Sequence, residues 1–268
     1  MKPLVKQRQA PASLQAAQVT MTTTKDVLLP LATSSLACSA TLIELTIPQV
    51  VRLSQPTAEP LPATPLTARL AMLPRLLGPQ TALTVVQFGC IRELRDAMDR
   101  WRGPHPLHLS LSYGLVSGPC RSAAYNLLIA GTYAHHGRAL PGDFTIERFW
   151  RTKVVPGLAW SVLRDSGSVG GGIVVAPYVV PRDASPPVKF LGGLGCGACC
   201  GLATQLFHNA ALTAGRMAEA GTRPGTLEAM RLCIKEHGAS ALYVNYPYRV
   251  AVIALWTGIL HVADPFRL

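Results

Sequence analysis

Six apolar stretches dominate the pattern of hydrophobic and polar positions along this chain. They cover residues 27–51, 78–94, 107–134, 158–180, 190–215 and 239–260. Each is near the ~20 residues that a helix needs to cross a bilayer. The links between them alternate in length: 52–77, 135–157 and 216–238 are long, whereas 95–106 and 181–189 are short. This pattern predicts six membrane-spanning helices arranged in pairs.

Single charged residues interrupt several of these stretches. Glu44 lies in the first, Arg121 in the third and Arg249 in the sixth, while Arg164 and Asp165 stand at the start of the fourth. Charged side chains inside membranes almost always face a bundle interior or a water-filled cavity. We therefore predict that Arg121, Arg164 and Arg249 face a central cavity. There they bind an anionic substrate or, alternatively, pair with Glu44 or with backbone carbonyl groups.

Two of the long links show helical periodicity. Residues 142–155 ("GDFTIERFWRTKVV") and 225–239 ("GTLEAMRLCIKEHGA") carry apolar residues at helical spacing, which predicts short amphipathic surface helices. Gly238 is placed to end the second of them as a C-terminal cap. The first long link contains many prolines, so a helix there is predicted to be short or broken. These prolines are Pro56, Pro60, Pro62, Pro65 and Pro74.

A threefold repeat accounts for this arrangement. Arg75, Arg164 and Arg249 each precede an even-numbered stretch, at intervals of 89 and 85 residues. The repeat predicts three units of helix, surface helix and helix, with boundaries at about 27–103, 104–187 and 188–262. Residues 1–26 precede them as a basic arm, whose first 25 residues contain four basic residues and no acid. This is the composition of a mitochondrial presequence or, alternatively, of a solvated basic arm.

The composition favours a membrane protein over a soluble enzyme or a nucleic-acid binder. Hydrophobic residues make up 49% of the chain and charged residues only 15%, against about 25% charged in soluble domains. The net charge of +11 comes from scattered basic residues rather than from a basic stripe interleaved with aromatics. We therefore expect anionic lipid, and no nucleic acid, to account for the charge. A soluble all-α module is the remaining alternative.

The cysteines and glycines of residues 190–217 suggest two different chemistries. Cys196 and Cys199 form a C-x-x-C pair, but neither a second pair nor suitably spaced histidines accompany it, so we predict no metal site. Small residues spaced four apart let membrane helices approach closely. The sequence therefore predicts a packing face at Gly193, Gly197 and Gly201, and a similar one at Gly114 and Gly118. Since no catalytic triad, paired-carboxylate motif or phosphate loop occurs, we do not expect an enzyme or a cofactor.

These features together resemble the mitochondrial carrier family, solute carriers of the inner mitochondrial membrane with six helices in three repeats. The last repeat carries the resemblance best, through the glycine-rich stretch 190–217 and through 226–260, where Gly238 and Tyr243 keep the family's spacing from glycine to aromatic. In the second repeat "VLRDSGSVGGGIVV" is similar to the start of some members' fourth helix, and in the first "LLGPQTALTVVQF" matches loosely. The resemblance implies the carrier fold, with short matrix-side helices and cardiolipin at the helix ends.

The gate signature of that family is missing. Its odd-numbered helices end in Pro-x-acid-x-x-base, where the proline kinks the helix and the charges form a ring of salt bridges. The third repeat has Leu206, His208 and Ala211 at these positions, and the first has Pro48 and Arg52 but no acid. The second repeat, "YNLLIAGTY", has none of the three. Alternating access needs different contacts in each state, so we predict that the fold was kept and the transport cycle lost.

His208 and Asn209 stand where the acid of the signature would be. They form either a ligand or proton-linked site in the cavity or interhelical hydrogen bonds that replace the missing salt bridges. Taken together, the sequence predicts a carrier-derived structural subunit of a respiratory-chain complex or ATP synthase, with neighbouring subunits and membrane lipid as partners. The alternative is a working carrier that exchanges a small anionic metabolite.

Overall fold

The structure is a computed structural model, and it describes residues 28–45, 65–138, 147, 150–151, 155–181, 183–222, 225–243 and 246–266. The side chains of Arg121, Ser122, Tyr125, Asn126 and Glu219 are not among those described. All regular structure in the described ranges is helical, which confirms the predicted all-α class. The predicted basic arm, residues 1–26, lies outside these ranges.

The described part of each apolar stretch lies mainly on one helix or on consecutive helical segments. The first helix is Leu28–Leu45. The next two stretches fall on α2 (Leu66–Arg102) and α3 (Pro106–His135). The fourth is continuous from α5 (Leu158–Asp165) through the π-helical turn η2 (Ser166–Gly170) to α6 (Gly171–Val179). The fifth comprises α7 (Pro186–Ala203) and α8 (Gln205–Glu219), and the last is α10 (Tyr246–Ala263).

The surface helix predicted before the last stretch is present. It is α9 (Thr226–His237), and the 3₁₀ turn η3 (Gly238–Leu242) follows it. Gly238 ends the helix at a φ of +55°, where its N–H bonds the carbonyl of Ile234. This confirms the predicted glycine cap, since a side chain would be strained in that conformation. Of the other predicted surface helix, 142–155, only Glu147, Trp150, Arg151 and Val155 are described.

The proline-rich link does not break its helix where the sequence predicts. Helix α2 begins at Leu66 and continues through Pro74 and Pro79 over 37 residues. Met72 and Leu76 are buried in this part, and they pack with Leu128 of α3. Apolar packing against a neighbouring helix outweighs the hydrogen bond that each proline removes.

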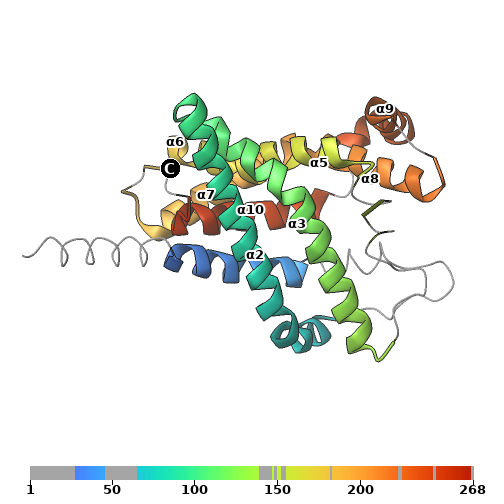
Figure 1. The fold of residues 1–268 in the computed structure, drawn as a ribbon, viewed down its shortest axis with the longest axis horizontal. Helices are drawn as coiled ribbons and strands as arrows, with labels where there is room; N and C mark the ends of the chain where they lie inside the picture. Colours follow the sequence, from blue (N-terminus) through green and yellow to red (C-terminus); the bar gives the residue numbers. More distant parts are fainter. Residues whose placement is uncertain are drawn as a thin grey trace, which may run out of the picture.

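Figure 1 shows how the helices are arranged. Helices α2 and α3 form an antiparallel hairpin that crosses the direction of α7 and α10, which pack along each other. Between α7 and α8 the chain bends by 51° at Thr204. Among the described helices, one is long and apolar enough on its own to cross a membrane, Leu28–Leu45, and the bent pair α7–α8 passes the same test together. The six-span carrier fold therefore stays a prediction.

The three glycines of α7 that are spaced four apart, Gly193, Gly197 and Gly201, face α10. A side chain at Gly193 would lie 2.9 Å from the Cα of Gly258, and one at Gly197 would lie 2.8 Å from the backbone oxygen of Ile253. A side chain at Gly201 would have more room, with its nearest atoms at 3.5 Å. On α3, Gly114 lies directly against Ser166 of η2, and Gly118 faces Leu158 of α5. Gly114, Gly193 and Gly197 thus stand where the backbones of neighbouring helices approach, whereas Gly118 and Gly201 face side chains.

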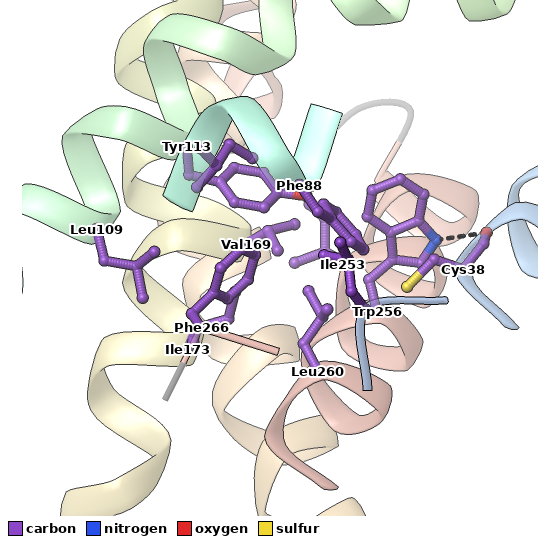
Figure 2. Packing of buried hydrophobic residues seen from close by; sticks show 12 residues of the cluster. Cys38, Phe88, Leu109, Tyr113, Val169, Ile173, Ile253, Trp256, Leu260 and Phe266 are labelled. Atoms are coloured by element: carbon purple, nitrogen blue, oxygen red, sulfur yellow. Dashed lines mark hydrogen bonds between the residues drawn. The ribbon is translucent and has the colours of Figure 1, made fainter. Parts of the chain in front are cut away.

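The buried apolar residues form three clusters. The largest, here the closed-end core, joins the first helix, α2, α3, η2, α6, α10 and the segment after α10 (Figure 2). It consists of Leu31, Cys38, Phe88, Ile91, Leu109, Tyr113, Val169, Ile173, Ile253, Trp256, Leu260 and Phe266. A hairpin cluster lies between the end of the first helix, α2 and α3, around Ile43 and Leu128. An α8 cluster joins α5, α8 and α9 through Trp160, Phe207 and Met230.

Candidate functional site

A cavity of about 100 Å³ lies inside the bundle, and residues from the first helix to α10 line it. Leu42 comes from the first helix, Gln80 and Gln87 from α2, and Tyr113 and Ser117 from α3. The cavity is bordered at one end by members of the closed-end core, among them Val169 and Trp256. Its polar wall carries Arg164, Asp165, His208 and Arg249, so three of the five residues predicted for the cavity come together there.

Arg164 and Asp165 form a buried ion pair on this wall. Their side chains are 7% and 4% exposed, and the guanidinium donates from Nε to Oδ1 at 2.8 Å and from Nη2 to Oδ2 at 3.0 Å. The third nitrogen, Nη1, lies 3.3 Å from Nδ1 of His208 on α8. Because an arginine only donates, Nδ1 of His208 accepts in this contact. The pair and His208 therefore tie α5 to α8 across the cavity wall.

Arg249 holds the bend between α7 and α8. Its Nη1 donates to the backbone oxygen of Gly201 at 2.5 Å and to Oε1 of Gln205 at 3.0 Å, and its Nη2 donates to Oγ1 of Thr204 at 2.7 Å. A break in a helix leaves backbone carbonyls without their intrahelical partners. The forked guanidinium is suited to such a site, since it offers several donors in one plane.

Asn209 is buried but is not a cavity-lining residue. Its Nδ2 donates to the backbone oxygen of Ala241 in η3 at 2.7 Å, and its Oδ1 accepts from Nε2 of Gln205 at 3.3 Å. Together with Arg249 these bonds connect α10, α8 and η3. The geometry of His208 and Asn209 is that of interhelical hydrogen bonding, one of the two interpretations that the sequence left open.

Arg75, the third arginine of the repeat, does not line this wall. The backbone of Arg121 belongs to α3, and its side chain lies outside the described set. Arg75 is exposed on α2 although it is in phase with Arg164 and Arg249 in the repeat. Glu44 lies 3.5 Å from Arg69, and it is not among the residues that line the cavity. The threefold sequence spacing therefore does not place three equivalent arginines around the cavity.

Sequence reasoning missed several polar residues of the cavity. Gln87 donates to Oγ of Ser117 at 3.1 Å and links α2 to α3. The Oε1 atom of Gln80 and the Oγ atom of Ser168 are buried without a protein hydrogen-bond partner in the described part of the chain. An uncharged glutamine or serine inside an apolar stretch is the signal that could have found them.

A second polar cluster lies at the turn between α2 and α3. The Asp99 carboxylate is 2.6 Å from Nδ1 of His108 and accepts from the backbone N–H of His105 at 3.3 Å. Partial burial raises the pKa of Asp99, but these hydrogen bonds and the charges of His108 and Arg95 lower it by more, so its pKa lies below the ordinary value. Within the described ranges, no group of three His, Cys, Asp or Glu residues has the arrangement of a metal site.

The cysteines of the C-x-x-C pair face different surroundings. Cys196 is buried against the neighbouring helices and Cys199 is exposed, and both are free thiols. Comparisons of this chain with family models, with curated proteins and with solved structures find no match.

Proposed function

We propose that this chain is a carrier-derived structural subunit of a large assembly in the mitochondrial inner membrane, such as a respiratory-chain complex or ATP synthase. The location in a membrane is supported by the distribution of polar and apolar side chains. Leu107, Leu111 and Leu115 follow one face of α3 and are 56%, 46% and 47% exposed. Soluble monomers rarely expose contiguous apolar surface of this kind, which is suited to lipid or to a neighbouring subunit.

In contrast to these exposed leucines, several polar side chains are buried between the helices. Ser39 of the first helix is fully buried, and its hydroxyl lies 3.0 Å from that of Thr84 on α2. Ser110 of α3 donates to the backbone oxygen of Ser166 at 2.7 Å. Such interhelical hydrogen bonds through small hydroxyl residues are typical of helices that associate inside a membrane.

The hydrogen bonds of the two cavity arginines support a structural role. Arg164 is held by Asp165 and His208, and Arg249 by the bend between α7 and α8. A substrate that used either guanidinium would have to replace bonds that join helices. Together with the missing gate signature, this favours a subunit whose polar interior holds the fold together over one that cycles between two states.

Association with a larger complex tests this proposal. We expect the chain to resist extraction from mitochondrial membranes by alkaline carbonate and to migrate with a respiratory complex or ATP synthase on a native gel. Deletion of residues 1–26 should release it from that complex. Migration of the intact chain as a free species of ~30 kDa, the size expected for one copy, would contradict the structural role, and carbonate extraction would contradict membrane insertion.

Exchange of a small anionic metabolite is the second candidate. One observation favours it: Arg164, His208 and Arg249 line the same cavity, where the Arg164–Asp165 pair is neutral and Arg249 adds one formal positive charge. In liposomes, the purified chain would then exchange labelled carboxylates, and Arg249→Gln would abolish the exchange. The exposed Arg75→Gln is the matched control. Exchange by the wild-type chain alone would overturn the structural proposal.

A further inference from the structure

The segment after α10 closes one end of the bundle. Helix α10 ends at Ala263, and Asp264 adopts a φ of +43° while its N–H bonds the carbonyl of Leu260 at 2.9 Å. A left-handed residue followed by proline is a common way to end a helix and to reverse the chain. Asp and Asn adopt this conformation more readily than most residues with a side chain. The reversal directs Phe266 back toward the bundle.

Phe266 is an integral part of the closed-end core. Its side chain is 1% exposed, and its ring packs edge-on against Phe88 of α2 with the centroids 5.6 Å apart. Phe88 packs in the same manner against Trp256 of α10 at 6.2 Å. The backbone oxygen of Phe266 accepts a hydrogen bond from Nη1 of Arg95 near the end of α2. Both the ring and the backbone of this residue are thus held by α2.

The position of Phe266 relative to the cavity follows from the order of residues along the helices. On α10 the cavity wall runs from Tyr248 to Trp256, and Leu260 comes next toward the end of the helix. On α2 Gln87 lines the cavity and Ile91 follows it. Phe266 belongs to the same cluster as Leu260 and Ile91 (Figure 2). This layer lies between the cavity and the end of the bundle where α10 finishes.

Phe266 differs from the rest of that layer in one respect. The other members of the closed-end core belong to helices or to the π-helical turn, whereas Phe266 is held on a short segment beyond α10. At the other end of the cavity, the lining residue Tyr248 is 52% exposed. Removal of the Phe266 ring would therefore open the sealed end without deleting any part of a helix.

We propose that the segment Asp264–Phe266 is a plug that seals one end of the central cavity, so that, among the described residues, the cavity opens at the end near Tyr248. The inference rests on the proposed insertion of the bundle in a membrane. An apolar constriction blocks ions because water does not fill it. Loss of the plug converts the one-ended cavity into a continuous aqueous path, through which a small anion passes under the positive charge of Arg249.

Chloride efflux from liposomes that contain the full-length chain tests this proposal. We expect the wild-type chain to leave chloride release near that of protein-free liposomes, and Phe266→Ala to raise it about tenfold, because the apolar seal is lost. Phe266→Leu keeps part of the apolar volume and should give an intermediate rate. The matched control is Val262→Ala, which changes a 39% exposed residue at the same end of α10 and should release chloride at the wild-type rate.

Two further measurements keep the outcomes separate. Circular dichroism shows which variants are folded. If Phe266→Ala does not fold, the chloride release of Phe266→Leu is compared with that of the wild type instead. Carbonate extraction of the same liposomes shows whether the chain is inserted. An extractable chain would refute membrane insertion. An inserted and folded Phe266→Leu variant with wild-type release would refute the plug alone, as would a wild-type chain that already releases chloride at a high rate.

Discussion

The two ends of this bundle are built on different principles. At the end where α10 finishes, six helical segments and Phe266 share one apolar core with three interlocked aromatic rings, Phe88, Trp256 and Phe266. At the other end the apolar contacts separate into the hairpin cluster and the α8 cluster. The cavity and its buried ion pair lie in the part between them. The comparison teaches that apolar packing closes the end where α10 finishes, whereas polar bonds hold the cavity wall next to it.

Among these predictions, loss of Arg164 from the polar cavity wall should reduce stability most. In Arg164→Met the buried Asp165 carboxylate loses the guanidinium that neutralises it, and breaking a buried ion pair costs about 3–5 kcal/mol. The free energy of unfolding, measured by denaturation of the purified chain in detergent, should fall by this amount. The double variant Arg164→Met/Asp165→Leu should recover most of the loss, because it removes both charges. A double variant as unstable as the single one would show that charge is not the cause.

Gly197→Ala tests the close packing of α7 against α10. The added methyl group would lie 2.7 Å from Oγ1 of Thr257 and 2.8 Å from the backbone oxygen of Ile253, so the helices must separate. Overpacking of this kind costs about 1–3 kcal/mol. Gly195→Ala is the control on the same helix, since nothing lies within 4 Å of its added methyl group. Equal melting temperatures for the two variants would contradict the packing role of Gly197.

Arg249→Lys tests whether the arginine acts as a fork at the bend of α7 and α8. A lysine keeps the charge but cannot bond the Gly201 carbonyl and the Thr204 hydroxyl from one plane, so we expect a loss of about 1–2 kcal/mol. Arg75→Lys, on the exposed face of α2, should leave the unfolding free energy unchanged. If charge alone mattered, Arg249→Lys would be as stable as the wild type.

The smallest effect should come from pH at the turn between α2 and α3. The pKa of Asp99 is lowered in the folded chain, so its stabilisation is fully present above the ordinary Asp value of 3.8 and is lost as the pH falls through the lowered pKa. Asp99→Asn should remove this part of the acid dependence of the melting temperature. Unchanged acid dependence in the variant would mean that the bond between Asp99 and His108 does not stabilise the fold.

The helices were predictable from the sequence where local pattern is sufficient. The apolar stretch 107–134 became α3, and the spacing of apolar residues from Leu227 to Ile234 became α9, with Gly238 as its cap. Prediction failed at Pro74, because the propensity of proline to break a helix is outweighed by the packing of Met72 and Leu76 against α3. That packing partner lies more than 50 residues away along the chain.

For the candidate site, charge inside an apolar stretch was a sufficient signal for Arg164 and Arg249, and place in the missing gate signature for His208. The repeat spacing wrongly suggested that Arg75 is equivalent to Arg164 and Arg249, since Arg75 is exposed. Charge also gave no signal for Gln80 and Ser168, whose uncharged side chains place polar atoms at the same cavity. Convergence of these residues depends on how the helices that line the cavity cross, which no local pattern contains.

The sequence by itself determined the helical class, the apolar segments and the glycine cap that ends α9, because periodicity and capping act over a few residues. Only the tertiary structure decided that apolar packing closes one end of the cavity and that polar bonds hold the cavity wall. It joined Arg249 to the bend at Thr204 and brought Phe266 back against Phe88. These contacts join positions that are 45 or more residues apart, and burial in a shared core or cavity wall is what makes them favourable.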